Sequence, residues 1–135
     1  MKMKVYITYQ FKDANTEELK VKLEEFSKLI EESTKWKPFI FFRDVQKWRK
    51  GTMKVDEILK KAMQSIKECD AILVEASEKA RGAYFEVGYA KALNKKVIVI
   101  HKKDTEADFL EASADVKIEY EDYDDLKKKL KKVKI

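Results

Sequence analysis

The chain has 135 residues, of which 44% are hydrophobic, 41% charged and 11% aromatic. This length suits one domain, expected to span residues 1–135, and the aromatic content excludes an intrinsically disordered chain. The longest apolar runs, at 39–42 and 97–100, are far shorter than the roughly 20 residues of a membrane span, and the first residues lack the apolar core of a signal peptide. We therefore expect a cytoplasmic protein with no membrane partner.

Ligands for soft metals are scarce in this sequence. Cys69 is the only cysteine and His101 the only histidine, which excludes an intramolecular disulfide and a structural zinc site. We expect neither a metal nor a cofactor. Many Lys and Glu residues beside few Gln, Gly and Pro residues also suit a heat-adapted source.

The formal net charge of +5 is concentrated at the end of the chain. Six lysines lie among residues 127–135, and without them the acidic residues slightly outnumber the basic ones. A nucleic-acid binder usually carries a basic patch on a folded face, whereas this pattern is typical of a solvated terminal helix. A nucleic-acid partner is therefore not expected.

The first predicted element is a strand at residues 4–9, which are rich in β-branched and aromatic side chains. Asn15 can cap a following helix, in which apolar residues recur at helical spacing up to Ile30. A second strand is predicted at 38–42. The charged segment at 43–51 is predicted to be a loop.

A second helix is predicted from 55 to 69, because apolar residues mark one of its faces. The short apolar segment 71–75 is predicted to be the third strand, and 77–82 a turn. A third helix is expected at 83–93, followed by a fourth strand at 97–101.

Residues 116–120 are predicted to form a fifth strand, and a lysine-rich helix follows Asp125. Short apolar strands that alternate with helices indicate an α/β fold with three layers. We expect a doubly wound, flavodoxin-like or Rossmann-like sheet of about five mainly parallel strands. Ligands of such sheets bind beyond the carboxyl ends of the strands, so the turns after the first and third strands are the expected location of a site.

The turn after the third strand leads to Glu86, within the first two turns of the next helix. Gly82 allows a tight turn or a close approach of the backbone to a ligand. The Glu86 carboxylate would then face the crevice. The alternative is that Glu86 only complements the positive N-terminus of its helix.

Residues 69–100 carry a longer pattern: Asp, a loop with Gly, an aromatic residue, Glu, an apolar residue, Gly, Tyr, Ala and a strand that begins with Lys. Its members are Asp70, Gly82, Glu86, Gly88, Tyr89, Ala90 and Lys96. This pattern resembles the nucleoside 2-deoxyribosyltransferase family and the related 2′-deoxynucleoside 5′-monophosphate N-glycosidases. The resemblance implies that Glu86 is the nucleophile on the anomeric carbon of a small-molecule nucleoside or nucleotide.

The resemblance extends to the first strand, where Tyr6 would orient Glu86. The pattern also makes Gly82 and Tyr89 candidates for substrate binding. Tyr9 is a further candidate because it lies at the end of the first strand, where its side chain would face the pocket. Relatives complete their sites from a neighbouring subunit, so a homodimer or a higher homo-oligomer is also implied.

The sequence departs from this family in three places, one of which is the small turn with Gly that is usual after the N-terminal strand, where this chain has TYQF at 8–11. An Asp that handles the leaving base is usual where this chain has Ala62, and an Asp or Ser is usual where it has Ala80. Arg81 could compensate by holding a phosphate at the N-terminus of its helix.

Two alternatives remain open. The segments 5–13 and 41–51 are similar to TIR domains, in which a Glu at the place of Glu86 attacks the ribosyl–nicotinamide bond of NAD. The alanines at positions 62 and 80 favour a third interpretation, a non-catalytic nucleotide-binding module that keeps the fold without the chemistry.

Overall fold

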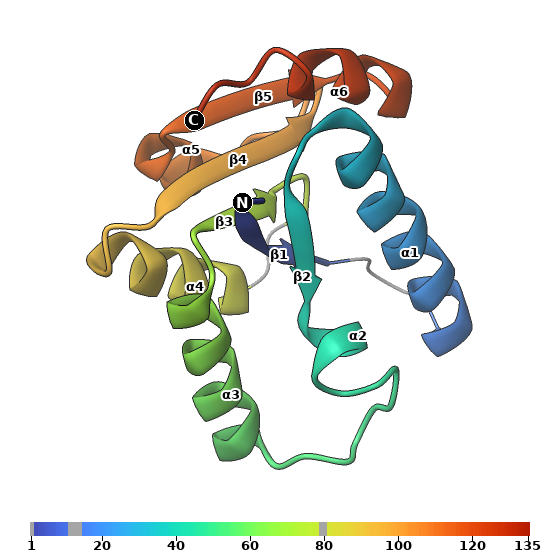
Figure 1. The fold of residues 1–135 in the computed structure, drawn as a ribbon, viewed down its shortest axis with the longest axis vertical. Helices are drawn as coiled ribbons and strands as arrows, with labels where there is room; N and C mark the ends of the chain where they lie inside the picture. Colours follow the sequence, from blue (N-terminus) through green and yellow to red (C-terminus); the bar gives the residue numbers. More distant parts are fainter. Residues whose placement is uncertain (1, 11–14, 79–80) are drawn as a thin grey trace.

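The computed structural model describes residues 2–10, 15–78 and 81–135. In this part of the chain, five parallel strands form one sheet in the order β2-β1-β3-β4-β5 (Figure 1). The strands are β1 (Lys4–Tyr9), β2 (Lys37–Ile40), β3 (Ala71–Glu75), β4 (Lys96–Lys102) and β5 (Val116–Tyr120). The order reverses between β1 and β3, so the expected doubly wound sheet is confirmed.

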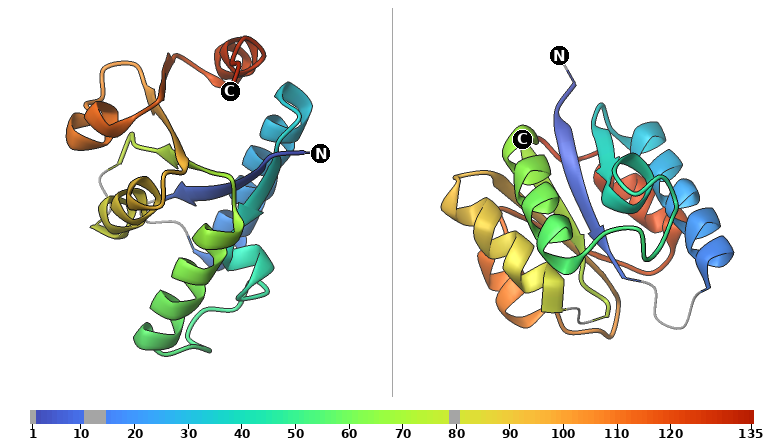
Figure 2. Two further views of the ribbon diagram at one scale, coloured as in Figure 1. Left: turned by 60° about the vertical axis from the view of Figure 1, so that its left-hand side comes forward. Right: turned by 90° about the horizontal axis from the view of Figure 1, so that it is seen from below.

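Helices cover both faces of the sheet, which gives three layers (Figure 2). The helices are α1 (Thr16–Ser33), α2 (Phe41–Asp44), α3 (Val55–Glu68), α4 (Arg81–Ala92), α5 (Asp108–Ser113) and α6 (Tyr123–Leu130). Buried side chains of α1 and α6 share one hydrophobic core, and those of α3, α4 and α5 share the other. Each face of the parallel sheet is thus shielded from water, as its apolar strands require.

The strands contribute side chains to both cores, because successive side chains of a strand point to opposite faces of the sheet. In β1, Val5 and Ile7 pack in the core of α1 and α6, whereas Tyr6 packs in the core of α3 and α4. All five residues of β3 are buried. This alternation directs the even-numbered side chains of β1 toward the helix that carries Glu86.

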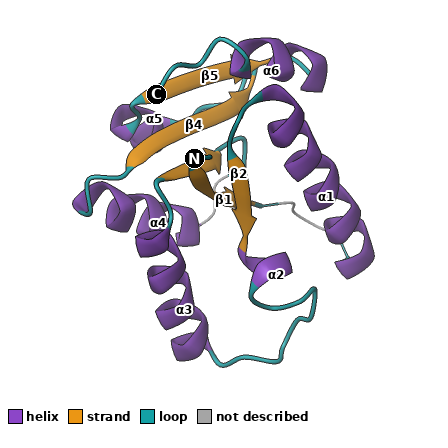
Figure 3. Ribbon diagram, in the orientation of Figure 1, coloured by secondary structure: helices purple, strands orange, loops and turns teal. Residues whose placement is uncertain are grey.

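The second predicted strand is shorter than expected. Phe41 and Phe42 belong to the short helix α2 and not to β2, so the expected strand 38–42 and the expected loop 43–51 are both partly wrong (Figure 3). The physical reason is local: the Asp44 carboxylate accepts the backbone N–H of Ile40 at 2.9 Å and ends the extended backbone there.

Two other elements differ from expectation. Helix α4 begins at Arg81, so Arg81 and Gly82 lie in the helix and not in the preceding turn. Helix α5 was not predicted, because it has six residues and buries only Leu110. Among the described residues, no helix is long and apolar enough to cross a membrane.

Candidate active site

A cleft of about 230 Å³ opens at the carboxyl end of β1, near the point where the strand order reverses. Its walls come from β1, from the end of β2, from α2 and the loop that follows it, and from α1, α3 and α4. The described residues that line it are Tyr6, Ile7, Thr8, Tyr9, Leu23, Ile40, Phe41, Phe42, Gln46, Ile58, Ala62 and Glu86. The cleft therefore lies at the edge where the fold predicts a ligand.

Glu86 reaches this cleft from α4, and two hydroxyl groups of β1 hold it. The Tyr6 hydroxyl donates a hydrogen bond to Oε2 of Glu86. The Thr8 hydroxyl donates to Oε1 at 3.0 Å. Tyr6 and Thr8 are two residues apart on a strand and so share one face. Contacts at both oxygens fix the plane of the carboxylate.

Burial and hydrogen bonding act on Glu86 in opposite directions. Burial raises the pKa of the Glu86 carboxyl above its usual range, because it disfavours the charged form, and the donors Tyr6 and Thr8 lower it in part. Burial and the neighbouring Glu86 raise the pKa of Tyr6, which therefore stays protonated as a donor. Tyr6 is 2% exposed, whereas Thr8 is half-buried at the cleft. The Thr8 side of the carboxylate is thus the more accessible one.

The outer wall of the cleft is aromatic and largely apolar. Phe41, Phe42 and Gln46 contribute to it from α2 and beyond, and Ile58 and Ala62 from α3. Gln46 offers the cleft an uncharged amide, a donor and an acceptor in one group. The lining thus combines a single carboxylate with aromatic rings and one amide.

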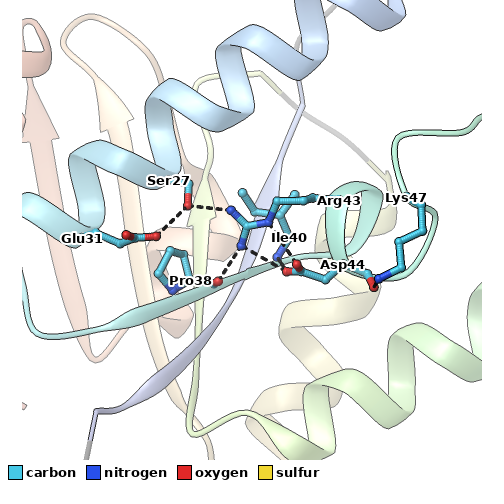
Figure 4. A network of polar contacts seen from close by, with 7 residues as sticks. All are labelled: Ser27, Glu31, Pro38, Ile40, Arg43, Asp44 and Lys47. Carbon is cyan, nitrogen blue, oxygen red and sulfur yellow. Dashed lines mark hydrogen bonds and ion pairs between the residues drawn. The ribbon is translucent and has the colours of Figure 1, made fainter.

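A network around Arg43 fixes this wall to the rest of the fold (Figure 4). The Arg43 guanidinium donates to both oxygens of Asp44, at 3.0 and 3.2 Å. It also donates to the Ser27 hydroxyl of α1 at 2.9 Å and to the carbonyl of Pro38 in β2 at 3.0 Å. One side chain therefore ties α2 to α1 and to β2.

The segment that follows α2 has an unusual backbone conformation. Lys47 and Trp48 have φ values of 52° and 65°, the left-handed region that non-glycine residues rarely adopt. The Trp48 N–H donates to the carbonyl of Phe42 at 2.8 Å, and the two rings meet edge to face with centroids 5.4 Å apart. These contacts hold the chain that follows Gln46.

The structure brings together some of the predicted site residues and separates others. Tyr6, Tyr9 and Glu86 all line the cleft. Arg81 and Gly82 are exposed at the start of α4 and do not belong to the lining described. A Cβ built on Gly82 meets nothing within 4 Å, so no neighbour in the described chain requires glycine there.

The remaining predictions concern α4 and the two alanines. Tyr89 is half-buried and stacks on Phe85, with ring centroids 6.5 Å apart, outside the cleft. Ala62 lines the cleft, at the position where the resemblance expects an acid. Ala80 lies outside the described residues.

Sequence reasoning missed Thr8 and Gln46. Thr8 could have been found, because it is two residues after Tyr6 on a predicted strand and so had to face the same way. Gln46 lies in a segment without periodicity, and no signal in the sequence directs its side chain to the cleft.

A second cleft, of about 300 Å³, lies on the other side of β1. Glu75, at the end of β3, is 5% exposed there and accepts hydrogen bonds from the hydroxyl of Tyr120 and from the hydroxyl and N–H of Ser77. Tyr9 lines both clefts, and its hydroxyl is 3.3 Å from that of Tyr123. Tyr9 therefore separates the two clefts.

Known structures share this fold. The CMP N-glycosidase BcmB of Clostridium botulinum is 23% identical, with a TM-score of 0.65 over 94% of this chain and 96% of that one. A 2-deoxyribosyltransferase of Bacillus psychrosaccharolyticus is 17% identical, with a TM-score of 0.69 over 98% and 93%. A conserved protein of Enterococcus faecalis is 11% identical, with a TM-score of 0.63 over 97% and 98%.

A search of curated protein sequences finds no match. The family model for nucleoside 2-deoxyribosyltransferases, in contrast, matches residues 8–127, which include the third strand, Glu86 and the outer wall of the cleft. This match spans far more than half of the chain. The chain therefore belongs to the nucleoside 2-deoxyribosyltransferase family.

Proposed function

We propose that this protein cleaves or transfers a sugar at the N-glycosidic bond of a nucleoside or nucleotide, with Glu86 as the nucleophile. The observation that carries the proposal is the carboxylate of Glu86, held at both oxygens and facing a cleft at the switch point of the sheet. Family membership and the fold shared with a CMP N-glycosidase and a 2-deoxyribosyltransferase support it.

The chemistry follows from the charge that develops on the sugar. As the C–N bond breaks, its electron pair moves to the base and the anomeric carbon becomes electron-poor. An oxygen of Glu86 bonds to that carbon and forms a glycosyl ester. Water or a second base then attacks the same carbon, and the carboxylate is released unchanged.

The neighbours of Glu86 have positioning roles in this scheme. Tyr6 keeps its hydrogen bond to Oε2 when that atom becomes the carbonyl oxygen of the ester. Oε1, on the Thr8 side, is then the attacking atom, because it lies on the more accessible side of the carboxylate. A fixed carboxylate needs less reorganisation when the substrate arrives.

We also propose that the protein acts as a homodimer or a higher homo-oligomer. Phe85, next to Glu86 in sequence, is 48% exposed on α4, and Phe109 on α5 is 82% exposed. Large apolar side chains on the outer side of neighbouring helices favour contact with a second chain. Sedimentation at several protein concentrations tests this, and a monomer throughout would contradict it.

A substrate panel tests the proposed activity. The protein would be incubated with ribonucleosides, deoxynucleosides, their 5′-monophosphates and NAD, with and without a second free base, and the released or exchanged base followed by chromatography. We expect release or exchange of base from a nucleoside or nucleotide. Cleavage of NAD without cleavage of any nucleoside or mononucleotide, those of nicotinamide included, would favour the TIR-like alternative, and binding without turnover would favour a non-catalytic module.

A further inference from the structure

The described lining of the cleft contains one charged side chain, Glu86, and no second acid. The position at which relatives would carry an acid for the leaving base is Ala62, whose side chain is a methyl group. Gln46 can form hydrogen bonds to a base but has no proton to give up. Among the residues that the structure describes, the site therefore combines a nucleophile with no second acid to protonate the leaving group.

The two tyrosines of the lining do not fill this gap. Burial raises the pKa of both Tyr6 and Tyr9, so neither gives up its proton readily. The Tyr6 hydroxyl already donates a hydrogen bond to Glu86. General acid catalysis works best when the pKa of the acid lies near the working pH, and these hydroxyls are far from that condition.

A neutral base needs such a proton, but a cationic base does not. When the base is bonded to the sugar through a positively charged nitrogen, the electron pair of the C–N bond neutralises that charge and the base leaves as a neutral molecule. We propose that this cleft acts on N-glycosides with a cationic base, such as pyridinium ribosides, an inference that rests on the proposed function.

The walls of the cleft suit a cationic base in two further ways. The rings of Phe41, Phe42 and Tyr6 line the same cleft as the Glu86 carboxylate, and aromatic rings attract cations. Among the lining residues described, no Lys or Arg opposes that attraction. A cationic base in this cleft is thus drawn both to Glu86 and to the rings.

The full reaction balances without an added acid. Oε1 of Glu86 bonds to the anomeric carbon, and the C–N bond breaks with its electron pair returning to the ring nitrogen. Water then bonds to the anomeric carbon, the ester bond breaks, and one proton passes from the water to the solvent. The products are the free sugar, the neutral base and the original carboxylate.

The first experiment compares leaving groups on the same protein. The ribosides and 2′-deoxyribosides of nicotinamide, which are cationic, would be compared with those of adenine, which are neutral. Because cationic glycosides are intrinsically more labile, each kcat/KM is divided by the uncatalysed rate. We expect this acceleration to be at least about tenfold larger for the nicotinamide compounds, since the lost acid is commonly worth 10²–10⁴-fold for a base that needs it.

Ala62→Asp adds a second acid to the cleft, where Glu86 is the one acid among the lining residues described. It is expected to increase cleavage of the adenine nucleosides about tenfold or more relative to cleavage of the nicotinamide compounds, because only the neutral adenine base needs a proton as it leaves. Ala92→Asp is the matched control, because Ala92 is exposed near the end of α4 and lies outside the cleft lining. It should change neither rate.

A binding measurement covers the case in which a buried Asp prevents folding of that variant. Titration calorimetry with 1-methylnicotinamide, a cation without a sugar, and with neutral nicotinamide should show about tenfold tighter binding of the cation. Glu86→Gln should remove most of this difference.

The outcomes separate the two proposals. Equal acceleration of adenine and nicotinamide nucleosides, or equal binding of the two nicotinamides, would overturn the cationic-base inference and leave the proposed function standing. If no nucleoside of either class is cleaved, the proposed function fails and this inference fails with it.

Discussion

Replacing Thr8 by Val should raise the pKa of Glu86 further and move the acid limb of the activity to higher pH. Burial already raises this pKa, and the hydroxyls of Tyr6 and Thr8 offset part of the rise by donating to the ionised form. Val has nearly the shape of Thr but no hydroxyl. The variant therefore removes one of two donors with little change in packing.

The size of the shift follows from the contact. A hydrogen bond to a charged group is worth about 1.5–3 kcal/mol, and one pKa unit corresponds to about 1.36 kcal/mol. The Thr8 contact has an ordinary length of 3.0 Å and is only half-buried, so the low end of this range applies. We expect an upward shift of about one pH unit.

Two measurements check this shift. The pH dependence of kcat/KM on the best substrate of the panel gives the acid limb, and a carbon NMR titration of the Glu86 carboxyl gives the pKa without turnover. Thr8→Ser keeps the hydroxyl and should restore the wild-type midpoint. Thr52→Val, at an exposed loop position, is the control. A Thr8→Val midpoint equal to that of wild type would refute the claim that the Thr8 hydroxyl stabilises the ionised form of Glu86.

Glu86→Gln should raise the melting temperature at neutral pH but not at a pH below the usual pKa range of Glu. The reason is that the pKa of Glu86 is raised in the folded state, so its ionisation lowers the stability of the wild type as pH rises. Thermal unfolding across pH checks this, and a difference in melting temperature between variant and wild type that stays the same at every pH would contradict it. Tyr6→Phe should lower the rate with little change in melting temperature, whereas a strongly lowered melting temperature at full activity would show that the Tyr6 hydroxyl serves stability and not catalysis. Arg43→Gln, which cannot tie α2 to α1 and β2, should raise KM several-fold more than it lowers kcat in steady-state kinetics; equal changes would speak against a role in holding the wall. Replacing the lysines of the tail by Gln should weaken binding to a polyanion such as heparin and leave cleavage unchanged, while a selective loss of phosphorylated substrates would place the tail at the site. These lysines are Lys127, Lys128, Lys129, Lys131, Lys132 and Lys134.

The sheet could be predicted from the sequence because each strand is a short, apolar, β-branched segment between helical patterns. The C-terminal end of β2 could not be predicted, because it depends on one side-chain contact. The Asp44 carboxylate accepts the N–H of Ile40, and a helical turn begins there. Propensity alone favours continued strand through Phe41 and Phe42. Local side-chain chemistry overrides that propensity.

Site residues on regular helices and strands could be predicted from the sequence, whereas site residues that depend on irregular loops could not. Glu86 and Tyr6 stand on a helix and a strand, and their positions matched a known pattern. Gln46 and the Arg43 network depend on an irregular loop with two left-handed residues, which periodicity cannot describe. Arg81 was expected in a turn, but the helix begins at that residue, so the phosphate role proposed for it stays a prediction.

The central claim is that Glu86 is the nucleophile, and its most direct test is the turnover of Glu86→Gln on the best substrate of the panel. The amide keeps the shape of the side chain but supplies neither a negative charge nor a nucleophilic oxygen. We predict a loss of about 10³-fold or more in kcat, equivalent to about 4 kcal/mol of barrier at about 1.36 kcal/mol per decade. Circular dichroism would show that the variant is folded. Turnover within about tenfold of wild type would contradict the claim.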